Sequence, residues 1–337
     1  MPSALPVFGA QADIHYHAYA ASGILNPPSA TGMPYWSLNP YVGCAFGCAY
    51  CYARFAHRYA AERSGQAAVD AAPLPPAQAF ERRILVKAGA PLLLRQALAG
   101  AAGRALARGE RLVIGTATDP YQPAERRFGV TRALLEELAK AEGLQLTLIT
   151  KSPLVARDAA LLARIAQRSR LVVHLSLITL DRRLARVLEP RAPTPAARLR
   201  ALAALRRHGV TAGVNIMPVL PGLTDRPRRL RALIAAIAAA GGTHVNAGAL
   251  RLRAETQAHY LPVLEQRFPR LVARYRVAYD GRIEPGERYR AGLRAFVGRV
   301  CAEHGLRFGT VDEGGEDVPS GPLRRAVPAG LQLGLGV

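Results

Sequence analysis

The sequence is poor in several features that would assign it to common protein classes. Its 337 residues include only four cysteines, which are too few to form the disulfide framework of a small secreted protein. The longest apolar runs, such as 233–240, are far shorter than a membrane-spanning helix. Residues 1–12 lack the basic and apolar segments of a secretory signal. These absences predict a globular protein that acts in the cytoplasm, without a membrane partner.

Lysine is also scarce, and arginine therefore supplies nearly all of the positive charge behind the formal net charge of +21. A basic protein with a pI near 10.9 often binds the phosphates of a nucleic acid. An alanine- and arginine-rich chain also arises from a GC-rich genome, and arginines on helices, such as Arg198 and Arg200, usually face solvent. Nucleic acid is one candidate partner, and solvated helix faces are the alternative.

Three of the four cysteines lie in one short segment, at Cys44, Cys48 and Cys51. Closely spaced thiolates are soft ligands that select iron–sulfur clusters, zinc or copper(I) over hard cations. A cubane cluster has four irons, so three cysteines leave one iron open to a substrate or cofactor. A structural zinc ion is the alternative if His57 or the distant Cys301 supplies a fourth ligand, although no second Cys-x2-Cys pair follows.

The segment 39–54, with Tyr50 inside the cysteine spacing, closely resembles the cluster loop of the radical S-adenosylmethionine (radical SAM) superfamily. More narrowly, it is similar to the spore photoproduct lyase-related branch of that superfamily. The resemblance implies a 4Fe-4S cluster held by the three cysteines, with S-adenosylmethionine chelated to the open iron and Tyr50 beside the cofactor. It also implies an external low-potential electron donor, since the reduced cluster cleaves the sulfonium to a 5′-deoxyadenosyl radical.

Short apolar runs before and after this loop alternate with segments of helical character. The strand-like runs are Trp36–Tyr41, Leu112–Gly115, Leu144–Ile149, Leu171–Leu177, Val210–Met217 and His244–Leu250. Such continuous apolar runs are typical of buried parallel strands, and repeated βα units imply right-handed crossovers. Six strands are too few for a closed eight-stranded barrel. The alternation predicts an α/β fold, and the resemblance implies the partial (βα)6 TIM-type barrel of the superfamily.

The chain divides into four predicted regions. Residues 1–35 are rich in Pro, Gly and Ser and form an irregular N-terminal arm, and residues 36–253 form the barrel core. Residues 254–308 form a mostly helical extension with breaks at its prolines, and the Gly/Pro-rich residues 309–337 form a disordered tail.

Polar residues follow the second and third barrel strands, at the carboxyl ends where barrel enzymes place their active groups. Thr118 and Asp119 lie in a Thr-Asp-Pro-Tyr-Gln-Pro-Ala-Glu segment similar to that of the branch, which implies a place near the methionine amino group. Lys151 follows the third strand, and the resemblance implies that it pairs with the methionine carboxylate. An ordinary turn at Asp119 and a surface position for Lys151 are the alternatives.

The later strands supply further candidates. Ser176 lies on the same face of the fourth strand as His174, and the resemblance implies that Ser176 contacts the cofactor. The resemblance also places Asn215 on the adenine-contacting strand. Glu189 and Arg191, from a Glu-Pro-Arg turn, are assigned to the cofactor or substrate side, with a salt-bridged turn as the alternative.

One position departs from the branch. Photoproduct lyases carry a further cysteine at the end of the second strand that returns a hydrogen atom, and Ala117 stands at the matching position here. This departure argues against the same lyase reaction unless Tyr52, Tyr121 or another group donates the hydrogen. We therefore expect a radical SAM enzyme with an unidentified substrate, for which nucleic-acid lesions and modified bases are candidates. A non-catalytic iron–sulfur or zinc-binding protein that interacts with nucleic acid is the alternative function.

Overall fold

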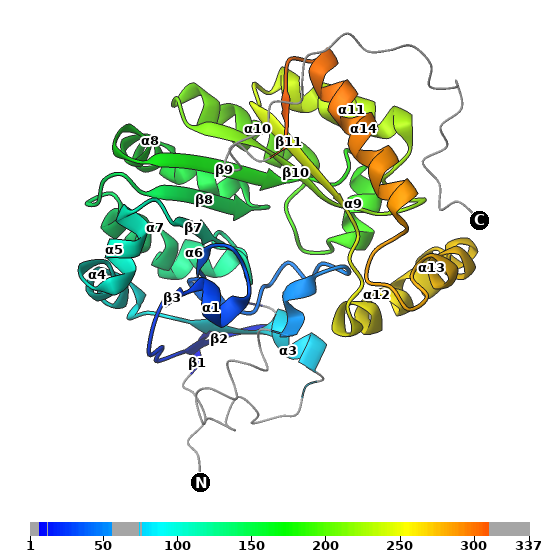
Figure 1. The fold of residues 1–337 in the computed structure, drawn as a ribbon. Coiled ribbons are helices and arrows are strands. Elements are labelled where there is room, and N and C mark those ends of the chain that lie inside the picture. Colours follow the sequence, from blue (N-terminus) through cyan, green and yellow to red (C-terminus); the bar gives the residue numbers. More distant parts are fainter. Residues whose placement is uncertain (1–6, 12, 56–73, 75, 310–337) are drawn as a thin grey trace.

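The computed structural model describes residues 7–11, 13–55, 74 and 76–309, and its largest element is an open sheet of mostly parallel strands. The six central strands are β4 (Trp36–Leu38), β7 (Arg111–Ile114), β8 (Gln145–Thr150), β9 (Arg170–Ser176), β10 (Thr211–Val219) and β11 (His244–Ala249). Each pairs in parallel with the next. The short β3 (Leu25–Asn26) and β12 (Arg307–Phe308) form the two edges, and these edges do not pair with each other in the described residues. The predicted partial (βα)6 barrel is confirmed (Figure 1).

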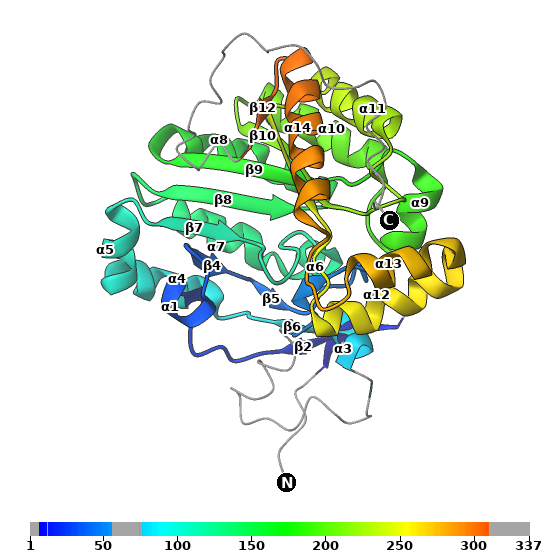
Figure 2. The same cartoon turned by 45° about the vertical axis from the view of Figure 1, so that its right-hand side comes forward.

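Helices cover the outer face of this sheet, as Figures 1 and 2 show. The larger ones are α4 (Ala90–Ala99), α5 (Ala101–Ala107), α7 (Val130–Leu138), α8 (Ala159–Arg168), α10 (Pro195–Arg207), α11 (Pro227–Ala239) and α14 (Glu287–Glu303). Shorter helical segments, not all of them on this face, are α1 (Pro28–Thr31), η1 (Tyr52–Phe55), α3 (Pro76–Arg82), α6 (Pro123–Phe128), η3 (Pro153–Asp158) and α9 (Arg182–Leu188). None of the described helices is long and apolar enough to cross a membrane.

The pleat of the parallel strands separates an apolar outer face from a polar inner face. Alternate strand residues such as Leu148, Val173 and Val214 belong to one large hydrophobic cluster that also contains leucines of the covering helices. The buried polar residues of the opposite face on β9, β10 and β11 are His174, Ser176, Asn215, His244 and Asn246. The buried polar residues of these strands are thus gathered on the face opposite the helices of the outer cluster.

The N-terminal residues form part of a second sheet. β1 (Val7–Gln11) pairs antiparallel with β2 (Ile14–Ala18), and β2 pairs in parallel with β6 (Arg83–Val86), whose other neighbour is β5 (Tyr41–Val42). Ile14 and Tyr16 are buried, as the alternation of a strand requires. The prediction that the arm is irregular was wrong. One partner of β2, the strand β6, lies far along the chain, and local patterns do not reveal that pairing.

Beyond β11 the chain is mostly helical, with α12 (Ala254–Arg267), η4 (Pro269–Leu271) and α13 (Val272–Ala278) before α14. Pro262 was expected to break a helix but lies inside α12, whereas Pro269 begins the short turn after it. β12 then returns the chain to the barrel sheet by pairing in parallel with β11. The predicted tail lies outside the described residues from residue 310 onwards.

Candidate functional site

The cysteine loop, residues 43–51, lies between β5 and η1 and is anchored through its backbone. The N–H of Cys44 donates to the carbonyl of Phe80 in α3 at 2.9 Å. The N–H of Ala49 donates to the carbonyl of Leu188, the last residue of α9, at 2.8 Å. The loop is therefore fixed to two elements that lie far apart in the sequence.

Two glycines give the loop its shape. Gly43 and Gly47 have φ angles of +84° and +63°, a left-handed backbone that L side chains rarely adopt. A Cβ on Gly43 would lie 2.7 Å from the Phe80 carbonyl oxygen, and a Cβ on Gly47 would lie 2.6 Å from Oε2 of Glu81. The backbone conformation favours glycine at both positions, and at Gly43 the rigid neighbouring backbone also excludes a Cβ.

The three thiols lie close enough to affect one another's ionisation. Burial raises the pKa of Cys44 to about 12, and the nearby charges of Asp119 and Cys51 add to this shift. Burial also raises the pKa of Cys48 and the pKa of Cys51. Burial makes thiolates unfavourable here, and bound iron ions would supply the positive charge that favours them. Three convergent soft donors on one loop fit an iron–sulfur cluster.

Of the two candidate fourth ligands for zinc, the one that the structure describes, Cys301, is not placed beside this loop. Cys301 is buried in α14 within the large outer hydrophobic cluster, whereas Cys44 and Cys48 belong to a separate cluster. His57 lies outside the described residues. Among the residues that the structure describes, no group of three or more His, Cys, Asp or Glu side chains could hold a single metal ion. A cluster makes a different demand, because each cysteine binds a different iron.

Thr118 supports the cysteine loop directly. Its hydroxyl donates to the Gly43 carbonyl, which also accepts a hydrogen bond from Nε2 of Gln122 at 3.0 Å. Oε1 of Gln122 in turn accepts from the N–H of Ala45 at 2.9 Å. Gln122 is fully buried, and it was not predicted from the sequence, although it follows the Thr118-Asp119 pair by only a few residues. Thr118 and Gln122 together hold the start of the loop against the end of β7.

Asp119 joins the ends of two neighbouring strands. Its carboxylate accepts from the Thr150 hydroxyl at 2.6 Å, from the N–H of Lys151 at 2.7 Å and from the N–H of Tyr121 at 2.9 Å. Burial raises the pKa of Asp119, and these hydrogen bonds oppose that shift. The carboxylate therefore fixes the position of Lys151 at the carboxyl end of β8.

Lys151 faces the cysteine loop. Its Nζ lies 5.7 Å from the centroid of the Tyr50 ring. Burial opposes the positive charge of Lys151, but the neighbouring Cys48 and Glu189 outweigh it and raise the pKa of the lysine. Lys151 therefore stays charged and offers an anion-binding group beside the thiols.

Glu189 links the loop to a buried arginine. It accepts hydrogen bonds from the Tyr50 hydroxyl and from the guanidinium of Arg198. Arg198 also donates to the carbonyls of Ser176 at 2.9 Å and of Pro193 at 2.8 Å. Arg198 was expected to face solvent on its helix, but only 1% of it is exposed. Its partner Glu189 becomes its neighbour only in the folded chain, so helical periodicity could not reveal this role.

Arg191 contacts the cysteine loop at a different residue from Glu189. Its Nε donates to the Ala45 carbonyl at 2.5 Å, and its guanidinium donates to Glu81 at 2.6 Å. Glu81 also accepts from Arg54, which in turn donates to the Cys48 carbonyl at 3.0 Å. Arg191 thus contacts the loop backbone and the carboxylate of Glu81, which also binds Arg54. Glu81 and Arg54 are supporting residues that no sequence motif indicated.

Ser176 and Asn215 are neighbours on the inner face of the barrel, because they pair in the register of β9 and β10. Oδ1 of Asn215 accepts from Nδ2 of Asn246 at 2.9 Å. One layer deeper, the rings of His174 and His244 meet at 3.0 Å between Nδ1 and Nε2. Burial lowers the pKa of His174 to about 4, so it is neutral at neutral pH. His174 is therefore a hydrogen-bonded interior residue beneath the Ser176–Asn215 layer.

Comparison with known proteins gives a match over most of this site. Residues 38–234 match the family model described as the radical SAM superfamily. An uncharacterized protein of Mycobacterium tuberculosis is 36% identical over 295 residues, which cover 87% of this chain and 82% of that protein. An uncharacterized protein of Methanocaldococcus jannaschii is 28% identical over 202 residues, which cover 60% of this chain and 66% of the relative.

Solved structures show the same fold. A spore photoproduct lyase variant with bound AdoMet and dinucleoside spore photoproduct aligns with a TM-score of 0.61 at 15% identity. The alignment covers 87% of this chain and 81% of that structure. A further variant of the lyase, with a single Tyr-to-Phe substitution, has the same TM-score and coverage. At 15% identity this similarity shows a shared fold and gives no information about the substrate of this chain.

Proposed function

Because the chain belongs to the radical SAM superfamily and is a radical SAM enzyme, we propose that it binds a 4Fe-4S cluster through Cys44, Cys48 and Cys51. Membership implies an iron–sulfur cluster and S-adenosylmethionine as cofactors, and a reductant as partner. When bound and reduced, these cofactors supply the 5′-deoxyadenosyl radical that abstracts hydrogen from a substrate. The reductant is an external low-potential electron donor, and we place the reaction in the cytoplasm because such a cluster needs reducing surroundings.

The observation that carries this proposal is the charged Lys151 beside the cysteine loop. Its Nζ lies over the Tyr50 ring, and Cys48 and Glu189 favour its protonated form. A fixed ammonium group beside an open cluster iron is suited to pair with the carboxylate of the methionine moiety. Ser176 and Asn215, one row of the inner face, provide polar groups for the nucleoside moiety of the same cofactor.

We propose that Thr118 and Asp119 hold other residues of the site in place and do not contact the cofactor. The Thr118 hydroxyl is bonded to the Gly43 carbonyl, and the Asp119 carboxylate already accepts three hydrogen bonds. Glu189 and Arg191 have the same supporting character, since each is bonded to a residue of the cysteine loop. These four residues orient the thiols and the ammonium group of Lys151.

For the substrate, we propose a nucleic-acid lesion or a modified base. The net charge of +21 supports a polyanionic partner, and a dinucleoside is the ligand named for the structural neighbour. The hydrogen-returning step differs from that of photoproduct lyases, because Ala117 carries no thiol. Of the two tyrosines suggested as substitutes, Tyr121 is buried with its hydroxyl on Asp158, whereas Tyr52 is exposed beside the loop.

The test is product formation by anaerobically reconstituted protein with dithionite and S-adenosylmethionine. We expect 5′-deoxyadenosine from the wild-type chain and from Cys301→Ala, and none from Cys44→Ala, Cys48→Ala or Cys51→Ala. Cys301→Ala is the matched control because it removes the fourth thiol of the chain, which lies away from the loop. A fully loaded cluster that yields no 5′-deoxyadenosine would refute the enzyme proposal. A colourless protein with one zinc per chain would favour the zinc-binding alternative.

A further inference from the structure

We propose that five arginines on and beside α9 form a docking strip for the phosphates of a single-stranded nucleic acid. This arginine strip consists of Arg182, Arg183, Arg186, Arg226 and Arg229, all of them exposed. The proposal rests on the nucleic-acid part of the proposed function and adds the place where the strand is held. It does not depend on which base or lesion reacts.

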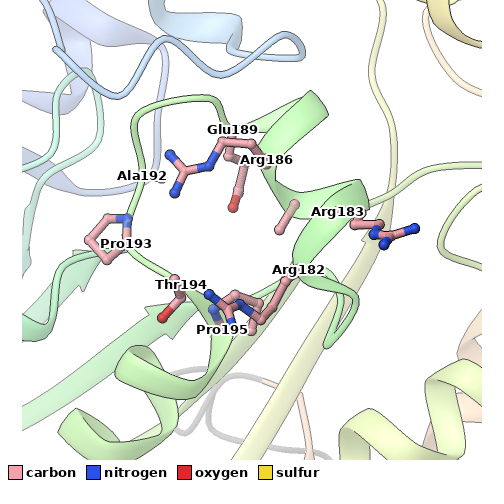
Figure 3. A pocket seen from close by; sticks show the side chains of 9 residues that line it. Arg182, Arg183, Arg186, Glu189, Ala192, Pro193, Thr194 and Pro195 are labelled. Carbon is pink, nitrogen blue, oxygen red and sulfur yellow. The ribbon is translucent and has the colours of Figure 1, made fainter.

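The first part of the strip borders a cavity of about 550 Å³ between α9 and the start of α10. Its lining residues are Arg182, Arg183, Ala185, Arg186, Glu189, Ala192, Pro193, Thr194 and Pro195. Figure 3 shows Arg182 and Arg186 on opposite sides of this cavity, while the guanidinium of Arg183 points away from it. An anionic group in the cavity would therefore meet cations on both sides.

The second part continues on the other side of α9. A cavity of about 370 Å³ is lined by Arg183, Arg226 and Arg229, by one carboxylate, Asp181, and by apolar residues that include Leu184 and Phe268. Arg183 lines both cavities and so makes the two basic sites continuous. A row of cations over two cavities suits a chain of phosphates, since a single phosphate would engage only one of them.

Few carboxylates balance this strip. Asp181 caps the N-terminus of α9 and lies 3.6 Å from Arg229, which accounts for one of the five cations. Glu189 is buried and already bonded to Tyr50 and Arg198. No residue in the described part of the chain forms an ion pair with Arg182, Arg183 or Arg226. Exposed arginines elsewhere, such as Arg168 with Glu142, often do have an acidic partner. The strip therefore keeps an uncompensated positive charge.

The strip also lies where a substrate strand would have to pass. α9 follows the carboxyl end of β9, and Arg226 follows the carboxyl end of β10, the side of the barrel that carries the cysteine loop. Glu189 lines the first cavity and accepts the hydrogen bond of Tyr50 from that loop. Glu189 thus borders both the basic cavity and the cysteine loop. A strand held by the strip would present its bases next to the radical chemistry.

The experiment measures binding separately from catalysis. Cluster-reconstituted full-length protein is titrated anaerobically into a fluorescein-labelled oligothymidylate of about a dozen nucleotides, and anisotropy is recorded over a series of salt concentrations. The variant is Arg182→Gln/Arg183→Gln/Arg186→Gln. The control is Arg104→Gln/Arg164→Gln/Arg207→Gln, which makes the same charge change at exposed positions on α5, α8 and α10.

We expect the strip variant to bind at least tenfold more weakly. The slope of log K against log salt should become shallower by about 2, because each phosphate contact on a single strand contributes about 0.7. The control should bind like the wild type. An equal loss of affinity in both variants would overturn the proposal, because it would show that net charge alone drives binding. A strip variant that binds as tightly as the wild type would also overturn it.

Two further measurements complete the test. Inorganic phosphate, added at the same total phosphate concentration as a competing unlabelled oligothymidylate, should displace the labelled strand much less well. Equal displacement by both competitors would mean that the cavities bind single phosphates, and this result would refute the strand-docking proposal. Formation of 5′-deoxyadenosine by the wild type without nucleic acid tests the radical chemistry independently, so a failure of either proposal is recognised on its own.

Discussion

The hydroxyl of Tyr50 donates a hydrogen bond to the carboxylate of Glu189, and this contact joins the cysteine loop to the C-cap residue of α9. The two residues lie 139 positions apart and are both buried. Burial opposes the charge of Glu189, but Arg198 and Lys151 outweigh it and lower the pKa of this carboxyl group. The loop therefore rests on a buried carboxylate that stays ionised because two cations surround it.

Removing one of these cations should destabilise the whole protein. Arg198→Met leaves the carboxylate of Glu189 buried and without its guanidinium partner, and such a change lowers the free energy of unfolding by about 3–5 kcal/mol. Urea denaturation of both proteins measures the difference. Arg200→Met, an exposed position on the same helix, is the control and should change the free energy by less than about 0.5 kcal/mol. Similar values for the two variants would show that the buried pair has no special role.

The shape of the cysteine loop can be tested at Gly47. In Gly47→Ala the new Cβ would lie 2.6 Å from Oε2 of Glu81 and 2.8 Å from Nη2 of Arg191, so these two side chains, which support the loop, must move away. We expect iron content after reconstitution to fall below roughly half of the wild-type value, since the strained loop no longer presents its thiolates together.

Gly129→Ala is a closely matched control for this change. Gly129 has nearly the same φ, +62°, but a Cβ added to it would have no neighbouring atom within 4 Å. This variant should lose about 1–2 kcal/mol of stability from the left-handed backbone alone and should still bind iron normally. Equal iron content in Gly47→Ala and Gly129→Ala would contradict the proposed role of the loop geometry.

Lys151 should contribute to cofactor affinity and not to cluster assembly. A hydrogen bond to a charged group is worth about 1.5–3 kcal/mol, so Lys151→Met should weaken S-adenosylmethionine binding by roughly 10- to 100-fold. Equilibrium dialysis of the reconstituted protein measures this, with iron content as a check that the cluster is present. Lys140→Met is the control, because Lys140 pairs with Glu137 on the surface. An unchanged dissociation constant for Lys151→Met would remove Lys151 from the cofactor site.

The barrel strands could be predicted from the sequence because their apolar runs are local signals. Val173 and Leu175, for example, face the covering helices in the outer cluster. The second sheet could not be predicted, since the pairing of Tyr16 with Ile84 joins segments that carry no common local pattern. The burial of Arg198 was missed for the same physical reason: only the fold brings Glu189 to it. The cysteine spacing indicated a metal-binding loop, but not the side chains of Gln122 and Glu81 that hold that loop in place.

Asp225 gives the protein a pH-dependent stability that a single variant can isolate. Burial raises the pKa of this carboxyl group to about 6, although the Gly222 N–H and the Tyr289 hydroxyl hydrogen-bond to it and oppose the shift. The folded state therefore holds the proton more tightly than the unfolded state, whose pKa is near 3.8. The stabilising contribution is present at low pH and is lost as the pH rises from about 4 to 6.

Asp225→Asn removes this titration but keeps the contacts, because its amide oxygen can accept from Gly222 and its NH₂ group can donate to the Tyr289 oxygen. The free energy of unfolding of the wild type minus that of Asp225→Asn should fall by about 2–3 kcal/mol between pH 4 and pH 7. Urea denaturation of both proteins at a series of pH values measures this difference, and every other titrating group cancels in it. If the free energies of unfolding of the two proteins change in parallel over this pH range, the carboxyl group of Asp225 has the same pKa in the folded and unfolded chain, which would contradict the prediction.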